Sequence, residues 1–262
     1  MKLLNLFAIL LFLSFIFQSC GKIDASEGEI SSEIFEVPDF NKIEIETAGV
    51  LNYTQSAERN VEVSTNAKIL DLLDIKVEDN TLKISMTKNK LITNEESLVF
   101  TVSDDDVYSI STSGSAIVNA NFDEGHSFEM IELISSGSGN IEQDAINASH
   151  ANISTSGSGN INVQTVNLLN NMTVIQSGSG NVDIAGSADQ FNLTISGSGS
   201  FSHHDFISQK VVAKLSGSGN ANVSVSYDLN ASLSGSGNLT FKGNPILKAT
   251  SNSGSGQVID GN

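Results

Sequence analysis

The sequence predicts an all-β protein: a right-handed parallel β-helix (β-solenoid) of about 20-residue coils with an irregular β-rich N-terminal cap. A Ser-Gly-Ser-Gly-Asn motif recurs at a nearly constant interval in the second half of the chain, flanked by alternating apolar and polar residues. Period-2 alternation is typical of strands with one buried and one solvated face. The composition agrees, because 22 Gly, 2 Pro and no Trp in 262 residues suit short strands joined by Gly-rich turns.

Residues 1–19 are expected to be a lipoprotein signal peptide. Residues 3–17 form a 15-residue apolar run, about 22 Å long as a helix, which is too short for the roughly 30 Å core of a bilayer. The following Phe17-Gln18-Ser19-Cys20-Gly21 resembles the lipobox at which signal peptidase II cleaves before a cysteine that is then acylated. The resemblance implies lipid attachment at Cys20 and a membrane partner through that lipid. The alternative is an ordinary cleaved signal with an incidental cysteine.

Charge and cysteine content exclude several classes of protein. The chain has 13 Lys and Arg, of which Arg59 is the single arginine, against 30 Asp and Glu, and its formal net charge is −17. Nucleic-acid binding needs a basic surface and is therefore excluded. One cysteine excludes a disulfide framework and cysteine-ligated metals. No cofactor is expected.

The first part of the secreted chain is divided into a linker and a cap. Residues 20–33 are small, polar and acidic, and are expected to form a flexible tether. Residues 34–110 are expected to be the irregular β cap, with a helical turn or two within 67–74. A β-helix exposes unpaired backbone groups at each end, and this charge-dense segment is suited to cover one of them.

Residues 111–262 are expected to form the coils, continuous with the cap in one domain. The leading glycines of the motif lie 18 to 23 residues apart, which indicates one coil per copy. Parallel stacking would place equivalent turn residues about 4.8 Å apart, where Gly accepts positive φ and Ser and Asn bond along the stack. Antiparallel hairpins would need a turn every 8–12 residues, and right-handedness follows the usual hand of parallel crossovers. The expected structural turn residues are Gly137, Gly139, Asn140, Gly157, Gly159, Asn160, Gly178, Gly180, Asn181, Gly197, Gly199, Gly217, Gly219, Asn220, Gly235, Gly237, Asn238, Gly254 and Gly256.

The serial Gly-Ser-Gly-Asn turns, with the opening Asp39-Phe40-Asn41-Lys42-Ile43, resemble the family of "putative auto-transporter adhesin, head GIN domain" proteins. The likeness covers roughly residues 39–260. It implies a right-handed parallel β-helix displayed on the envelope of Gram-negative bacteria, and it implies no defined biochemical activity.

Neither catalysis nor a metal site is expected. β-Helix lyases need a base beside a calcium-binding carboxylate cluster, and hydrolases need convergent acids. Here the acids fall in different coils at different phases of the repeat, as in Asp183, Asp189, Asp205 and Asp228. His203-His204-Asp205 is the most metal-like cluster, but adjacent strand residues point to opposite faces, so a polar turn is expected. Asp104-Asp105-Asp106 lacks the ligand spacing of a calcium loop and is expected to be an exposed acidic turn.

Three functions remain, all in an outer-membrane lipoprotein that is surface-exposed or periplasmic. The favoured one is a non-catalytic surface adhesin or binding module that uses the stacked Ser/Asn face on an unknown protein or glycan. The alternative is a periplasmic structural or regulatory lipoprotein that binds a protein through its acidic N-terminal half, and the third is a polysaccharide-active enzyme. The last coil is short, so its edge is expected either to be blunted by Asp260 and chain disorder or to pair in a homo-oligomer.

Overall fold

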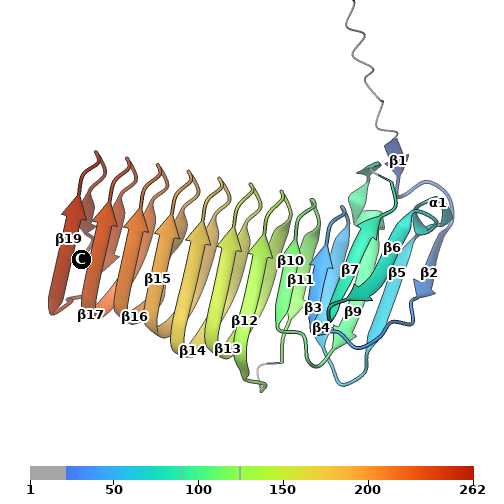
Figure 1. Cartoon of the computed structure of the whole chain (residues 1–262), viewed down its shortest axis with the longest axis horizontal. Helices are drawn as coiled ribbons and strands as arrows, with labels where there is room; N and C mark the ends of the chain where they lie inside the picture. Colours follow the sequence, from blue (N-terminus) through green and yellow to red (C-terminus); the bar gives the residue numbers. More distant parts are fainter. Residues whose placement is uncertain (1–21, 89, 124) are drawn as a thin grey trace, which may run out of the picture.

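The computed structural model describes residues 22–88, 90–123 and 125–262, except for the side chains of His203, His204 and Leu247. The predicted leader and Cys20 lie outside the described residues. The prediction of an all-β stack of parallel coils is confirmed, and the stack is an elongated solenoid (Figure 1).

Each regular coil consists of one Ser-Gly-Ser-Gly turn and one long strand that bends halfway. The long strands are β13 (Asn140–Thr155), β14 (Ile161–Gln176), β15 (Val182–Ile195), β16 (Phe201–Leu215) and β17 (Ala221–Leu233). Neighbouring strands are parallel, and register shifts in each pair fall near the bends. Equivalent inward residues therefore stack into buried columns, one of which runs Ile141, Ile161, Val182, Phe201, Ala221 and Leu239.

The coils at the N-terminal end are stacked in a different order from their order along the chain. β3 (Lys42–Ile45) and β4 (Val50–Gln55) form one coil, β7 (Thr81–Met86) and β9 (Val99–Asp104) a second, and β10 (Ser109–Thr112) and β11 (Ile117–Asn121) a third. β3 pairs in parallel with both β7 and β10, and β4 with both β9 and β11. The coil of β3 and β4 thus lies between the other two. β12 (Phe128–Ser135) pairs with β10 and begins the next coil. Much of the segment predicted to be an irregular cap is therefore regular solenoid.

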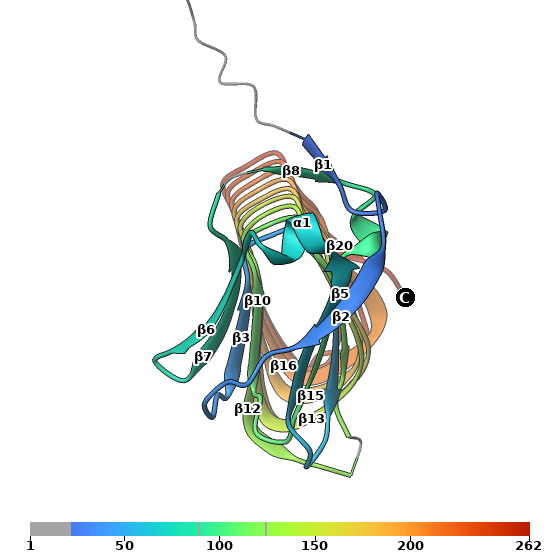
Figure 2. The ribbon, with the colours of Figure 1, turned by 90° about the vertical axis from the view of Figure 1, so that its right-hand side faces the viewer.

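A switch from parallel to antiparallel pairing closes this end of the stack. β5 (Asn60–Asn66) is antiparallel to β9, β2 (Ile30–Ile34) is antiparallel to β5, and β6 (Leu73–Glu78) is antiparallel to β7. The short helix α1 (Ala67–Leu70) lies across the end (Figure 2), and the 3₁₀ helix η1 (Glu95–Ser97) directly precedes β9 in the chain. Asn66 caps α1 by accepting a hydrogen bond from the Ile69 amide, and the Ile69 side chain is fully buried.

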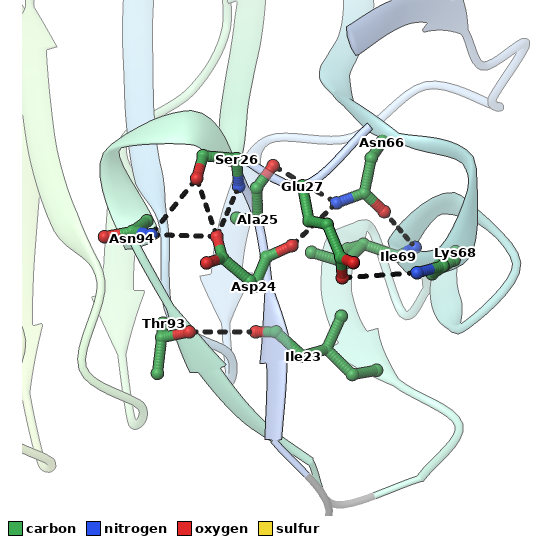
Figure 3. Close-up of polar contacts among 10 residues, drawn as sticks. All are labelled: Ile23, Asp24, Ala25, Ser26, Glu27, Asn66, Lys68, Ile69, Thr93 and Asn94. Carbon is green, nitrogen blue, oxygen red and sulfur yellow. Dashed lines mark hydrogen bonds and ion pairs between the residues drawn. The ribbon is translucent and has the colours of Figure 1, made fainter. Parts of the chain in front are cut away.

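The prediction of a flexible tether is wrong from residue 22 onward. β1 (Lys22–Asp24) pairs in parallel with β8 (Leu91–Thr93), and β2 joins the main sheet. The Asp24 carboxylate accepts hydrogen bonds from the Ser26 amide and hydroxyl and from Asn94 Nδ2 (Figure 3). Composition suggested flexibility, but the small polar side chains satisfy one another and fix the segment to the fold.

The C-terminal end is ordered and polar, so the expectation of chain disorder there is wrong. β18 (Leu239–Lys242), β19 (Leu247–Asn252) and β20 (Val258–Asp260) complete the stack. In the last coil Lys248 takes the position of Leu229, and Asp260 that of Phe241. Lys248 Nζ lies 4.2 Å from the centre of the Phe241 ring, and the Asn262 side chain binds both backbone polar groups of Gly243. Charges at core positions oppose edge-to-edge stacking, which favours the blunted end among the two expected alternatives.

Candidate functional site

The Ser-Gly-Ser-Gly turns form a continuous ridge along one side of the solenoid (Figures 1 and 2). We define this serine ridge as residues 136–139, 156–159, 177–180, 196–199, 216–219, 234–237 and 253–256. Its backbone continues the parallel ladder through the turns, because the Ser158 amide donates to the Gly137 carbonyl at 2.9 Å and the Ser179 amide to Gly157 at 2.9 Å. The same bond recurs up the ridge, so each turn is held by the turn before it.

The ridge requires glycine for a steric reason, and the expectation of positive φ is wrong. The described glycines with φ in the left-handed region are Gly28, Gly49, Gly186 and Gly243, none of them on the ridge. A Cβ on Gly157 would lie 1.9 Å from the Gly137 carbonyl oxygen, and a Cβ on the other ridge glycines would lie between 1.8 and 2.5 Å from a carbonyl oxygen of the preceding turn. Coils at β-sheet spacing leave no room for a methyl group there.

An asparagine ladder runs beside the glycines. The Asn160 amide donates to Asn140 Oδ1 at 2.9 Å, and the Asn181 amide to Asn160 Oδ1 at 2.9 Å. The same bond continues through Ser200, Asn220, Asn238 and Gln257. The side-chain oxygen of one coil thus takes the place of a missing backbone acceptor for the next, which is why a short residue with an oxygen recurs at this position.

A buried polar column under the first turns was missed by the sequence reasoning. Thr112, Ser135, Thr155 and Gln176 are buried and directly precede their turns. Ser135 Oγ donates to the Gly139 carbonyl at 2.8 Å, and Gln176 Nε2 to the carbonyls of Gly180 and Ser200 at 3.2 and 3.1 Å. The available signal was a polar residue at the inward phase of the alternation immediately before several Ser-Gly-Ser-Gly copies.

The outer surface of the ridge is an array of hydroxyl groups without charge. Both serines of every ridge turn are exposed, giving two rows that repeat once per coil. The seven ridge turns contain no charged residue, although the whole chain has a net charge of −17. Among the described residues no group of three or more His, Cys, Asp or Glu is arranged to hold a metal ion. The ridge is equipped for hydrogen bonding to an extended partner.

A hollow of about 460 Å³ lies at the N-terminal end of the ridge. Its lining joins the first turns to the β8 region: Ser113, Ser138, Met86, Leu91, Ile92, Lys90, Glu46 and Glu95 are among its residues. Burial, and secondarily Glu96, raises the pKa of Glu95. The hollow therefore combines apolar walls with a cation and two carboxylates at the point where the hydroxyl rows begin.

A second hollow, of about 310 Å³, is lined by aromatic side chains and a methionine, together with the acids Asp106 and Glu129. Tyr108, Phe128, His126 and Met130 contribute to it, and the His126 and Phe128 rings are 4.4 Å apart. The sequence does not indicate this hollow, because no residue type in it is distinctive alone. The usable signal is that Tyr108 and Phe128 are 20 residues apart, which is one coil.

The predicted exposed acidic turn at residues 104–106 is wrong for its first member. The Asp104 side chain is 1% exposed, and its Oδ2 lies 2.6 Å from Arg59 Nε. Arg59 also pairs with Asp39, and the Tyr53 hydroxyl donates to the Asp104 carbonyl at 2.9 Å. Burial, together with the nearby Asp carboxylates, raises the pKa of Tyr53. This cluster joins β4 and β9 to Arg59, the residue before β5, and is structural.

The remaining predicted features are only partly described. The expectation of a polar turn at His203-His204-Asp205 is wrong, because these residues lie within strand β16. The side chains of His203 and His204 lie outside the described part of the chain, as does Cys20. The expectation that the four named acids fall in different coils is wrong for Asp183 and Asp189, which both lie in β15, whereas Asp205 lies in β16 and Asp228 in β17. No helix in residues 22–262, as far as they are described, is long and apolar enough to cross a membrane.

Comparison with known proteins gives one family and several similar folds. The family described as "Putative auto-transporter adhesin, head GIN domain" matches residues 39–245. A putative adhesin from Bacteroides fragilis is 24% identical, with 90% of this chain and 98% of that one covered and a TM-score of 0.64. From Parabacteroides distasonis, a putative adhesin is 22% identical (90% and 98% covered, TM-score 0.80), and a putative lipid binding protein is 22% identical (91% and 100% covered, TM-score 0.75). No curated protein matches the chain significantly.

Proposed function

Since the chain belongs to the family of putative auto-transporter adhesin head GIN domains, we propose that it is a non-catalytic lipoprotein of the Gram-negative outer membrane. In this proposal Cys20 carries the lipid, and the serine ridge binds an extended protein or glycan. The family supports a place in the envelope or on the cell surface. The lipobox-like residues 17–21 support acylation.

The observation that carries the proposed binding role is the serine ridge itself. Exposed hydroxyls repeat at the spacing of stacked strands, about 4.8 Å, on a backbone bonded from coil to coil. A partner with regularly spaced hydrogen-bonding groups would meet a surface that needs no reordering on binding, which lowers the entropic cost of association. The ridge also lacks the charges that would repel anionic polymers from the rest of the molecule.

The non-catalytic assignment is supported by the distribution of acids and bases. From residue 111 onward there are four lysines and no arginine. Asp183 and Asp189 share β15, Asp205 lies in β16 and Asp228 in β17, and among the described residues no three acidic or histidine side chains gather at one point. The ridge offers hydroxyl and amide groups alone. A lyase or hydrolase of this fold needs a proton-transferring pair at one point, which these residues do not supply.

Binding is tested with the purified chain from residue 21 on a panel of glycans, matrix proteins and envelope polymers. The ridge variant Ser179→Arg/Ser198→Arg places bulk and charge on two adjacent turns. The matched control is Asn167→Arg/Ser187→Arg, because these exposed residues are register partners on neighbouring coils away from the ridge. We expect the ridge variant to lose at least tenfold in affinity while the control binds as wild type. Equal binding by both variants would overturn the ridge as the contact surface.

Location is tested separately in cells. A Cys20→Ser chain should remain an unacylated precursor and leave the detergent phase, whereas continued partitioning would contradict the lipid anchor. Protease treatment of whole cells then distinguishes a surface adhesin, which is cleaved, from a periplasm-facing lipoprotein that binds another protein, which survives.

A further inference from the structure

The fold holds the chain firmly from the third residue after the proposed acylation site. Thr93 Oγ1 donates to the Ile23 carbonyl at 3.4 Å, and the Ala25 amide donates to the Thr93 carbonyl at 2.9 Å. Asn66 Nδ2 donates to the carbonyls of Asp24 and Ala25, and Asn94 Nδ2 to the Asp24 carboxylate (Figure 3). Ala25 is fully buried. The entry of the chain into the domain is therefore a fixed point.

This fixed point leaves very little chain between the fold and a lipid on Cys20. Cys20 and Lys22 are two residues apart, which spans about 7 Å when extended. Lys22 is the register partner of Leu91 across the parallel pair, about 4.8 Å further away. Lys22 would thus lie within about 7 Å of the bilayer surface, inside the roughly 8 Å Debye length at physiological salt, and the start of β8 within about 12 Å.

The side chains at this edge differ from the rest of the surface. Lys22 and Lys88 are exposed, Lys90 is half-buried, and Leu91 is 47% exposed. We call these four residues the anchor edge. They hold three of the twelve cations that remain after the leader is removed, whereas the chain from residue 20 has a formal net charge of −18, because Lys2 is the only charged residue of the leader.

The two segments that form the anchor edge carry no carboxylate between residues 20 and 23 or between residues 86 and 92. Asp24 is the last residue of β1, and Glu95 comes two residues after the end of β8. Glu46 and Glu95 line the hollow with Lys90 and Leu91, and Asp71 precedes Leu72, whose carbonyl accepts from the Thr87 amide.

We propose that the anchor edge docks on the anionic headgroups of the membrane that holds Cys20. The inference rests on the proposed acylation. Lysines near a membrane attract anionic lipids, and one lipid modification combined with basic residues holds a protein more firmly than either alone. Leu91 adds an apolar contact at the interface. β1 and the stacked turns lie on the same side of the solenoid in both views (Figures 1 and 2), so the hollow at the start of the serine ridge would open beside the headgroups.

The test uses the acylated protein reconstituted in vesicles. Cys20 is the single native cysteine and is blocked by the lipid, so one added cysteine can be labelled specifically. A fluorophore at Thr87→Cys, next to the anchor edge, reports energy transfer to a headgroup dye, and a fluorophore at Ser187→Cys, halfway round a coil, serves as the distant reference. Vesicles of phosphatidylglycerol with phosphatidylethanolamine are compared with phosphatidylcholine vesicles.

We expect transfer from position 87 to be stronger on the anionic vesicles and to fall by about half in the variant Lys22→Glu/Lys88→Glu/Lys90→Glu. The control Lys210→Glu/Lys214→Glu/Lys242→Glu makes the same charge change on exposed lysines of β16 and β18 and should leave transfer unchanged. If the protein is acylated but energy transfer from position 87 changes neither with lipid charge nor in the anchor-edge variant, the docking inference alone is overturned. Protein found unacylated by mass spectrometry would overturn the proposed lipoprotein together with this inference.

Discussion

Replacing Gly157 by alanine tests the steric explanation of the repeat. The new Cβ would lie 1.9 Å from the Gly137 oxygen, whereas ordinary contact begins near 3.4 Å. The two coils must therefore separate locally by about 1.5 Å. That displacement breaks the bonds from the Ser158 and Gly159 amides to Gly137, which are 2.9 and 3.2 Å long.

The magnitude follows from these losses. Two backbone hydrogen bonds contribute about 1 kcal/mol each, and residual overpacking adds about 1–3 kcal/mol. The lower entropy of the unfolded alanine chain offsets about 0.5 kcal/mol. We expect a net loss of about 3 kcal/mol in the free energy of unfolding.

Urea unfolding monitored by circular dichroism measures this loss. Gly125→Ala is the matched control, because its φ is not left-handed and its nearest neighbour is the flexible Asp123 side chain at 3.4 Å; it should be neutral or slightly stabilising. Because a solenoid unfolds in units of coils, a reduced m-value for Gly157→Ala would indicate local unzipping. Equal midpoints for the two variants would refute the steric account.

Four further predictions concern named side chains. Asn160→Ala should lower the free energy of unfolding in urea by about 1 kcal/mol, because the Asn181 backbone amide loses its hydrogen-bond acceptor. An unchanged midpoint would show that the asparagine ladder does not stabilise the stack. Hydrogen bonds from Asn94, and secondarily from Ser26, hold the pKa of the Asp24 carboxyl group below its ordinary 3.8. These bonds therefore stabilise the attachment of β1 above pH 3.8, and the stabilisation is lost as the pH falls through the folded-state pKa of Asp24. Exchange protection of the β1 and β8 amides should therefore fall in acid, and protection that stays constant from pH 6 down to pH 2 would contradict this. Arg59→Ala should cost about 3 kcal/mol by leaving the buried Asp104 without its cation, with Arg59→Lys recovering part of the loss. Lys248→Leu should make the monomer associate end to end in sedimentation, because it removes the inward charge from the last coil; a persistently monomeric variant would show that this charge is not what protects the edge.

The solenoid was predictable because the Ser-Gly-Ser-Gly-Asn turn occurs once per coil and its flanking residues alternate strictly. The interleaved N-terminal coils were not, because their turn at residues 46–49 reads Glu-Thr-Ala-Gly and carries no repeat signal. The position of this coil in the stack is shown only by the pairing of β3 with both β7 and β10. Sequence periodicity identifies which residues form a coil, but stacking order depends on which neighbours complete the buried columns.

The candidate site was predicted in part for the same reason. The recurrence of the glycines and asparagines could be predicted from the sequence. The reason for the glycines could not, because a close approach of neighbouring backbones and a positive φ both select glycine. The hollow beside Lys90 and Leu91 could not be predicted, because it joins the β8 segment to turns near Ser113 and Ser138 that lie more than 20 residues away. The ordered attachment of the chain around Asp24 could not be predicted, because residues 20–33 have a composition typical of linkers.

The turns of the solenoid stack in register and form one rigid ridge. Pulsed electron resonance between spin labels tests this arrangement in the chain from residue 21, which has no native cysteine. Labels at Ser138→Cys and Ser236→Cys are five coils apart, or about 24 Å along the stack, and labels at Ser158→Cys and Ser236→Cys are four coils apart, or about 19 Å. We predict two narrow distance distributions whose maxima differ by about 4.8 Å. Broad distributions, or a separation that does not change by one coil spacing, would contradict the ridge.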